Sequence, residues 1–452
     1  MKTYSLVDKI KNKIGKDANL KELLSGSAIT FVVKIIGMLI NYGVVLLISY
    51  KHGAEGVGVF GVVNSLITFL ALFCTLGTNV SVLRFVGQFK TEDSVFKLKH
   101  IIYRAMKLAI PTSIIVGTLV FYLSDLIALK IFKNIEYSIG LKIGAVALPF
   151  FTLNSINIEF IRGLKKLKIS EYFRSIHRFL IVLIILASGL FNYEVLNSLY
   201  GLGVGIVFTF LLSTSYILLF FYNRSSISHE NFTLTTKELF NTSTPMMTAA
   251  LCNFALNNMG LYFVEFFSTT QETGIYNVAF KLAQLVSLAL LVINTISAPK
   301  FSEMYWNNKI EELKTYLRQA SKTIFYISLV SSVIIMLLSE SILSIFGEDF
   351  ISGQWALFYL ITGQVISAIA GSVGIFMNMT GNHSFYTRIT FYILLFSVPL
   401  NFVMVKNFGM NGAAISSLIS VASLNIIAAV IVYKKIGFTT FYNPFKTNKI
   451  NE

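Results

Sequence analysis

Charged side chains are scarce in this sequence. Asp, Glu, Lys and Arg make up 13% of its 452 residues, whereas a soluble globular protein carries about 25%. Acidic residues are the rarer kind, at 22 against 37 Lys and Arg, while 55% of the residues are hydrophobic. Because so few ionic groups cannot cover the surface of a soluble protein of this length, the composition excludes that class.

Residues that build disulfide frameworks and metal centres are also few. The two cysteines, Cys74 and Cys252, both lie within apolar runs, which argues against a disulfide framework. The five histidines are scattered, no Cys/His spacing typical of a metal site occurs, and no phosphate-binding loop of the Gly-Lys-Ser/Thr type is present. We therefore expect no metal, no other cofactor and no ATP hydrolysis by this chain.

What the sequence does have is long apolar runs. Twelve stretches, most about twenty residues long, are each long enough to cross the roughly 30 Å hydrocarbon core as a helix. Lipid offers no hydrogen-bond partners, and these runs lack the alternation of barrel strands. We predict an all-α polytopic membrane protein with about twelve transmembrane helices. The predicted spans are residues 23–49, 57–82, 102–124, 139–161, 178–193, 196–222, 241–267, 274–298, 323–346, 354–380, 385–404 and 410–433.

The basic residues predict the orientation of these spans. If the N-terminus is cytoplasmic, 30 of the 37 Lys and Arg residues fall in inner segments and 4 in outer loops. Cytoplasmic loops of membrane proteins carry such an excess, so we predict that both termini are cytoplasmic. The net charge of +15 is then a signal of topology, and we do not expect nucleic acid as a partner.

Two parts of the sequence resemble each other. After a shift of 216 residues the second predicted span overlays the eighth, and Gly58-Val59-Phe60 meets Gly274-Ile275-Tyr276. The repeat predicts two halves of six helices with the same orientation, an arrangement found in transporters that bind substrate between their halves. A duplication retained for packing alone is the alternative. The predicted organisation is a basic cytoplasmic segment (1–22), an N-terminal six-helix bundle (23–222), a cytoplasmic linker (223–240), a C-terminal six-helix bundle (241–434) and a cytoplasmic tail (435–452).

The two ends of the second span carry a resemblance to a known family. The segment His52-Gly53-Ala54-Glu55-Gly56-Val57-Gly58-Val59-Phe60 is similar to the Gly-x-Glu-x-x-Gly-x-aromatic turn of polysaccharide flippases. Leu76-Gly77 and Leu83-Arg84-Phe85 resemble the Leu-Gly and Arg pair that ends that span. In length, span count and six-plus-six organisation the chain resembles the Wzx-type O-antigen and capsule flippases of the multidrug/oligosaccharidyl-lipid/polysaccharide exporter superfamily.

This resemblance implies a fold and a function. Members of the family carry undecaprenyl-diphosphate-linked oligosaccharides across the bacterial inner membrane through a V-shaped cavity between two bundles. By that likeness we expect a multi-pass protein of the inner (cytoplasmic) membrane that works by alternating access and is not an enzyme. The expected partners are the polyprenyl-diphosphate-linked oligosaccharide, membrane lipid, and the polysaccharide polymerase and glycosyltransferases of the same pathway.

Cations inside apolar spans are the main candidates for a substrate site, because each costs roughly 2.5–3.5 kcal/mol at the centre of a membrane helix. Lys34 shares a polar stripe of the first span with Asn41, and Lys281 shares a face of the eighth span with Gln284. Each predicted half thus offers a cation beside polar groups, which suits a diphosphate and sugar hydroxyls. Snorkelling of either lysine toward an interface is the alternative.

Three further residues are candidates for the same cavity. Arg84 matches the position in the family, although anchoring of the span at the cytoplasmic surface explains it equally well. Asn253 and Asn257 share a face of the seventh span with Gly260, where they would form a cavity wall or bond neighbouring helices.

Charged residues near span ends have a simpler interpretation. Arg174, His177 and Arg178 cluster at the cytoplasmic start of the fifth span, where they could meet a lipid diphosphate, but ordinary inside-positive charge is the favoured explanation. Glu159 and Glu265 are the acids nearest the membrane core and are candidates for a coupling proton or cation. At span ends, however, a solvated carboxylate costs little.

Two other functions stay open. A multidrug exporter of the related, MATE-like branch would bind cationic drugs and favour carboxylates in its cavity, whereas this sequence offers lysines. A membrane polysaccharide polymerase or glycosyltransferase would need a sizeable outer loop with catalytic charges, and every predicted outer loop is short.

Overall fold

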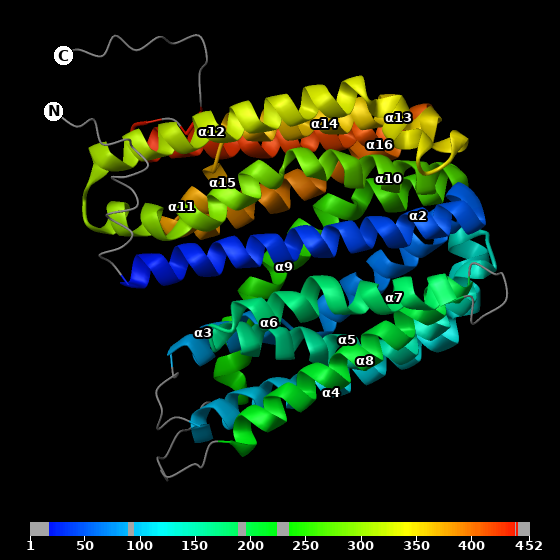
Figure 1. Ribbon diagram of the computed structural model, residues 1–452, viewed down its shortest axis with the longest axis horizontal. Helices are drawn as coiled ribbons and strands as arrows, with labels where there is room; N and C mark the ends of the chain where they lie inside the picture. The colour runs from blue at the N-terminus through cyan, green and yellow to red at the C-terminus, as the bar shows by residue number, and fades with distance from the viewer. Residues whose placement is uncertain (1–17, 89–94, 189–195, 224–234, 439, 442–452) are drawn as a thin grey trace.

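The computed structural model describes residues 18–88, 95–188, 196–223, 235–438 and 440–441, and every regular element within these ranges is a helix. Figure 1 shows most of the long helices running along the longest axis of the molecule, with α4, α5 and α8 on one side and α12, α14 and α16 on the other. The helices α2, α9 and α10 lie between these two groups (Figure 1). The prediction of an all-α protein is confirmed.

The helix bounds follow the apolar runs of the sequence. The first part of the chain forms α2 (Ala18–Cys74), α3 (Thr78–Gln88), α4 (Val95–Leu126), the π-helix η2 (Ile127–Phe132), α5 (Glu136–Gly163), α6 (Leu167–Glu171), the π-helix η3 (Tyr172–Ile176), α7 (His177–Ser188) and α8 (Leu196–Tyr222). The second part forms α9 (Thr236–Phe267), α10 (Thr270–Val286), α11 (Leu288–Trp306), α12 (Ile310–Leu337), α13 (Ser339–Ser344), the 3₁₀-helix η4 (Glu348–Gly353), α14 (Gln354–Ala370), α15 (Val373–Met379) and α16 (His383–Ile436).

Many of these helices can cross a membrane. In the described part of the chain, seven helical stretches are long and apolar enough, and the bent pair α10 and α11 would make an eighth. Two stretches, Thr30–Cys74 and His383–Lys435, have 45 and 53 residues, and at 1.5 Å per residue each exceeds twice the roughly 30 Å of a hydrocarbon core. The chain is therefore a multi-pass membrane protein, while the count of twelve spans and the division into two six-helix bundles stay predictions.

Glycines divide the two longest helices. Gly53 interrupts α2 with φ 62° and ψ −162°, and Gly409 interrupts α16 with φ 54° and ψ −136°. Residues with a Cβ rarely adopt this backbone conformation. Both glycines lie between two predicted spans, so each break falls where the sequence predicts that one span ends and the next begins.

The start of α9 differs from the predicted linker over 223–240. Thr235 and Glu238 form a capping box, in which Thr235 Oγ1 accepts from the Glu238 amide at 3.2 Å and Glu238 Oε2 accepts from the Thr235 amide at 2.9 Å. The helix therefore begins at Thr236. The bond from the Thr235 amide lowers the pKa of the Glu238 carboxyl. The predicted segments at 1–22 and 435–452 lie mostly outside the described residues.

One large apolar core joins both predicted halves. It contains buried residues of α2, α5, α7 and α8 together with residues of α9, α10, α13, α14 and α16, for example Val44, Val182, Val278 and Leu343. Since α13 is part of it, this core lies toward the end of the molecule that is drawn on the right in Figure 1. We call this end the shared end.

Two smaller cores lie toward the opposite end. One is built from α3, α4, α5, η3, α8 and the start of α9, and includes Val82, Phe160 and Leu239. The other is built from α11, α12, α14, α15 and α16, and includes Phe301 and Phe376. Leu239 of α9 belongs to the predicted linker, and among the described residues none of the C-terminal half (241–434) enters the first of these cores. We call this end the divided end.

Candidate functional site

Four predicted site residues line one pocket of about 430 Å³ between α2, η3, α7 and α10. Lys34 and Asn41 reach it from α2, and Lys281 and Gln284 reach it from α10. All four side chains are partly buried. The first span of the N-terminal half and the eighth span of the C-terminal half thus meet at this pocket, which we call the first pocket.

Hydrogen bonds join α2 and α10 at the first pocket. Lys281 Nζ donates to Asn41 Oδ1 at 2.6 Å, and the Tyr42 hydroxyl donates to the Lys281 carbonyl oxygen at 2.6 Å. Among the ion pairs of the described residues, none involves Lys34 or Lys281. An ammonium group that bonds to a neutral amide keeps its charge uncompensated and can attract an anion.

A third cation reaches the first pocket from η3. Arg174 and Ser175 line it, and α2 approaches η3 closely at Gly37. A Cβ at Gly37 would lie 2.6 Å from the Ser175 Cβ, so a larger residue would push the two helices apart. The π-helical turn and the missing side chain of Gly37 together bring Arg174 to the wall of the pocket.

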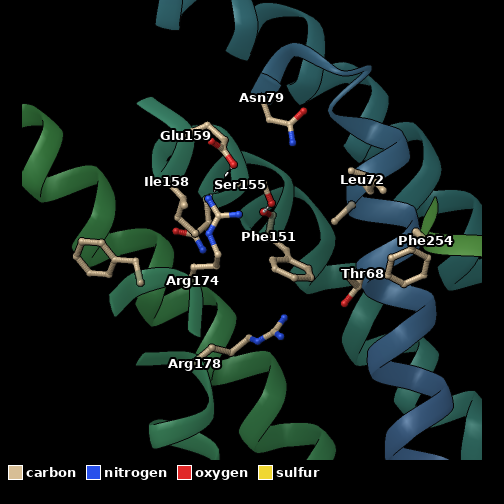
Figure 2. A pocket seen from close by; sticks show the side chains of 13 residues that line it. Thr68, Leu72, Asn79, Phe151, Ser155, Ile158, Glu159, Arg174, Arg178 and Phe254 are labelled. Carbon is tan, nitrogen blue, oxygen red and sulfur yellow. Dashed lines mark hydrogen bonds and ion pairs between the residues drawn. The ribbon is translucent and has the colours of Figure 1, made fainter. Parts of the chain in front are cut away.

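A second pocket, of about 300 Å³, is lined mainly by α2, α5 and the η3–α7 segment (Figure 2). Arg174 NH2 pairs with Glu159 Oε1 at 2.7 Å, and Arg174 Nε lies 3.6 Å from Glu171 Oε1. Arg162 NH1 lies 3.6 Å from Glu159 Oε2. Asn79 and Ser155 also line the second pocket.

Arg178 holds its guanidinium between two aromatic rings. The guanidinium carbon lies 4.8 Å from the centre of the Phe151 ring and 4.5 Å from that of Phe179, distances at which the ring faces attract a cation. Its Nε and NH1 atoms are buried and form no hydrogen bond within the ranges that the structure describes. Figure 2 shows the side chain extending toward the middle of the second pocket. The rings therefore fix a cation whose donors are available to a ligand.

The two pockets adjoin each other. Arg174 lines both, and Asn64 of the first pocket lies one helical turn from Thr68 of the second on α2. The first pocket is lined by three cations and by no carboxylate, and the second by two cations and one carboxylate, Glu159, which Arg174 already pairs. The lining of both pockets is thus positively charged overall.

The other predicted site residues lie elsewhere. Arg84 is exposed on α3 and lines neither pocket. Asn253 and Asn257 lie on α9 and donate to carbonyl oxygens of their own helix, those of Ala249 and Asn253, at 2.8 and 2.7 Å. They line neither pocket either, and the role of these three residues stays a prediction.

Sequence reasoning gave Arg174 and Arg178 too little weight. Their position at the predicted cytoplasmic start of a span favoured a role in topology, yet both line the second pocket. His177, the third member of that cluster, is buried and its Nδ1 lies 2.9 Å from Thr209 Oγ1, away from both pockets. A signal was present in the spacing of Arg174 and Arg178, because residues four apart share a helix face.

Two solved membrane transporters are similar to this chain in fold. A MOP superfamily transporter from Pyrococcus furiosus, described as having a binding pocket of reverse polarity, has a TM-score of 0.66 at 16% identity and covers 97% of this chain and 99% of its own. A multidrug resistance MATE family transporter in an inward-facing conformation has a TM-score of 0.71 at 16% identity and covers 91% of this chain and 98% of its own. At this identity the likeness shows the fold alone.

The sequence comparisons are more specific. The probable low-salt glycan biosynthesis flippase Agl15 of Haloferax volcanii is 19% identical over 194 residues, which are 43% of this chain and 41% of that relative. The chain therefore matches less than half of that curated relative's length. A family model described as polysaccharide biosynthesis protein matches residues 23–305. The resemblance to polysaccharide flippases is confirmed, and the chain belongs to the polysaccharide biosynthesis protein family.

Proposed function

We propose that the protein is a flippase that moves polyprenyl-diphosphate-linked oligosaccharide across a bacterial inner membrane, for O-antigen, capsule or a related polysaccharide. The observation that carries this proposal is the set of cations at the adjoining pockets. Lys34, Lys281 and Arg174 line the first pocket without a carboxylate. Ammonium and guanidinium groups bind phosphate oxygens through charge-assisted hydrogen bonds, so the first pocket suits the diphosphate of the lipid carrier.

The packing of the helices supports alternating access. The shared end has one core across both predicted halves, whereas the divided end has two separate cores. The first predicted span begins, and the last ends, toward the divided end (Figure 1), which the distribution of Lys and Arg places in the cytoplasm. The proposed state is therefore closed on the outer side and accessible from the cytoplasm. Rocking of the halves would move the diphosphate and glycan outward while the prenyl chain remains in lipid.

This function also implies which enzymes act before and after the protein. Glycosyltransferases would build the oligosaccharide on its lipid carrier at the cytoplasmic face, and a polymerase would use it on the outer face. The flippase itself would make and break no covalent bond, so it is not an enzyme in this proposal. Both termini would lie in the cytoplasm of the inner membrane.

A double variant tests the first pocket. Lys34→Gln with Lys281→Gln removes two positive charges and keeps much of the side-chain volume, so we expect surface polysaccharide to fall at least tenfold and lipid-linked oligosaccharide to accumulate inside the cell. The matched control is Lys130→Gln with Lys406→Gln, because both lysines are exposed and line neither pocket. Equal surface polysaccharide in the two double variants, at equal protein levels, would remove the first pocket as the substrate site.

A multidrug exporter is the second candidate, because a multidrug transporter shares this fold. Cationic drugs would be repelled by Lys34, Lys281, Arg174 and Arg178, so the charge of the pockets favours the flippase. Deletion of the gene separates the two functions directly. A flippase predicts loss of surface glycan with unchanged drug susceptibility, and an exporter predicts the opposite.

A further inference from the structure

The two pockets differ in chemistry although they adjoin. The first is lined by ammonium groups and has no carboxylate, which suits a ligand that only accepts hydrogen bonds. Both pockets contain amides, hydroxyls and aromatic rings, and the second adds a carboxylate, that of Glu159. A sugar hydroxyl both donates and accepts hydrogen bonds, and the C–H face of a pyranose ring is apolar. A carboxylate repels a phosphate but accepts a hydrogen bond from a hydroxyl, so the second pocket suits a sugar better than a diphosphate.

We propose that the second pocket binds the sugar that is attached to the diphosphate. This inference rests on the proposed function, because it takes the first pocket as the diphosphate site. It assigns the recognition of the glycan to α3, α5 and α2 of the N-terminal half, and the recognition of the carrier to Lys34 and Lys281, one from each half.

Polar groups of the second pocket can bind hydroxyls. Glu159 is 8% exposed; its Oε1 pairs with Arg174, and its Oε2, which lies 3.6 Å from Arg162 NH1, accepts no hydrogen bond within the described part of the chain. Asn154 Oδ1 accepts from Ser213 at 2.8 Å, which leaves the Asn154 amide nitrogen to donate. Figure 2 shows the amide nitrogen of Asn79 directed toward the pocket. A buried acceptor beside amide donors matches a hydroxyl that uses both of its functions.

Aromatic rings provide an apolar surface beside these groups. Phe151 of α5 and Phe254 of α9 both line the second pocket, and Figure 2 shows them on either side of Thr68. Small-ligand sites combine such apolar walls with a few polar groups that set the orientation. Phe254 comes from α9, so a bound sugar would also contact the helix that crosses from one predicted half to the other.

The spacing of the pockets fits a sugar joined to a diphosphate. Asn64 of the first pocket and Thr68 of the second are four residues apart on α2, which corresponds to about 6 Å along the helix axis. Arg174 lines both pockets, and the stacked Arg178 lies beside Phe179 of the first and Phe151 of the second. The donors of Arg178 therefore lie at the boundary, where the phosphate oxygen bonded to the sugar would be placed.

Binding of short carriers to the purified full-length protein tests this inference. The probes are farnesyl diphosphate and the same lipid linked to glucose, galactose or N-acetylglucosamine, and native mass spectrometry measures their affinities. We expect at least one glycosylated probe to bind wild type about tenfold more tightly than farnesyl diphosphate, since two or three hydrogen bonds of ordinary strength are added. Asn79→Leu with Ser155→Ala should remove this gain and leave the affinity for farnesyl diphosphate within twofold.

Controls separate the sugar site from the proposed function. Asn407→Leu is the matched control, because Asn407 is exposed on α16 and lines neither pocket; it should keep the tenfold gain. Lys281→Gln should weaken both kinds of probe alike. If wild type binds farnesyl diphosphate and every glycosylated probe equally well, the sugar site is wrong and the diphosphate site stands. If wild type binds none of the probes, the proposed function itself is overturned. Binding of farnesyl diphosphate also shows that each variant is folded.

Discussion

The shared end and the divided end of the molecule are held together in different ways. At the shared end α2 and α10 touch backbone to backbone: a Cβ at Gly274 would lie 1.8 Å from the Ala54 carbonyl oxygen, and one at Gly58 would lie 2.3 Å from that of Thr270. At the divided end the halves meet through α9, where Ser81 Oγ of α3 lies 2.7 Å from Ser243 Oγ. The divided end also has one close backbone approach, because a Cβ at Gly77 would lie 2.3 Å from the Ser243 carbonyl oxygen. The shared end thus has two such approaches between α2 and α10, and the divided end has one together with a buried hydrogen bond.

This difference indicates which end is built to separate. Close packing of small residues gains dispersion energy from many atoms at once and is lost when the helices move apart by a fraction of an ångström. A single hydrogen bond between hydroxyls contributes about 1 kcal/mol. Opening the shared end is therefore the costly step of the proposed cycle, and substrate binding has to offset that cost.

The largest expected effect comes from breaking the seam at the shared end. In Gly274→Val the new Cβ has no room beside the Ala54 carbonyl oxygen, so α10 has to move away from α2. We expect the free energy of unfolding to fall by about 3 kcal/mol, the upper range for overpacked sites, and export to be lost. Unfolding of the purified protein by heat and surface polysaccharide in cells measure the two effects.

Gly87→Val is the control for this change. Gly87 lies on α3, and a Cβ there would meet no atom within 4 Å. The free energy of unfolding of Gly87→Val should lie within about 0.5 kcal/mol of that of wild type, as is usual for surface substitutions. If Gly274→Val were as stable as this control, the seam between α2 and α10 would not hold the shared end together.

The sequence predicted the helices more completely than the site. Apolar runs have to be helical in lipid, and Gly53 and Gly409 mark breaks that lie between predicted spans. Lys34 and Lys281 stood out because a cation in an apolar run is costly. Both line one pocket, where α2 and α10 meet. These helices are far apart in the chain, and the repeat was the only feature of the sequence that suggested their contact.

Arg174 and Arg178 could not be assigned in the same way. At the predicted cytoplasmic end of a span a basic residue has a sufficient explanation in topology, so its charge carries little information on its own. What directs these two side chains into the pockets is the π-helical turn η3, the absence of a side chain at Gly37 and the rings of Phe151 and Phe179. Each of these depends on tertiary contacts that the periodicity of the sequence does not predict.

Removal of a buried charge at the shared end should stabilise the protein, by an amount smaller than the loss expected for Gly274→Val. Glu265 is 5% exposed; its Oε1 accepts from Thr270 Oγ1 at 3.0 Å, and its Oε2 has no hydrogen-bond partner among the described residues. At pH 8 the folded protein has either to bury this charge or to take up a proton, and both cost free energy. Glu265→Gln removes that cost and should raise the free energy of unfolding by about 2 kcal/mol.

Glu348→Gln tests whether this gain comes from burial. Glu348 is exposed in η4, and its replacement removes one carboxylate from the same predicted side of the membrane. The free energy of unfolding of this variant at pH 8 should therefore differ from that of wild type by less than about 0.5 kcal/mol. A stabilised Glu265→Gln would also favour the closed shared end, so export should slow while stability rises. A variant that is less stable than wild type would show that Glu265 has a favourable partner in the native protein.

The smallest expected effects lie at the divided end, and they differ between two neighbouring serines. Ser81 and Ser243 are both fully buried. Ser243 Oγ donates its only hydrogen to the Leu239 carbonyl oxygen at 2.7 Å, so Ser81 has to donate to Ser243. Ser81→Ala therefore removes one bond and leaves Ser243 with its donor satisfied, at a cost of about 0.5 kcal/mol. Ser243→Ala removes two bonds and leaves the Ser81 hydroxyl buried without a partner, at a cost of about 1.5 kcal/mol.

Heat unfolding of both variants, with Ser215→Ala as the control, measures this order. Ser215 is exposed on α8, and among the described residues its hydroxyl bonds only to the Leu211 carbonyl oxygen of its own helix. Ser215→Ala should therefore lower the free energy of unfolding by less than the change at either buried serine. Equal losses for Ser81→Ala and Ser243→Ala would contradict the assignment of Ser81 as the donor. The expected order, with both losses below that of Gly274→Val, would show that this polar contact of the divided end is weaker than the seam between α2 and α10 at the shared end.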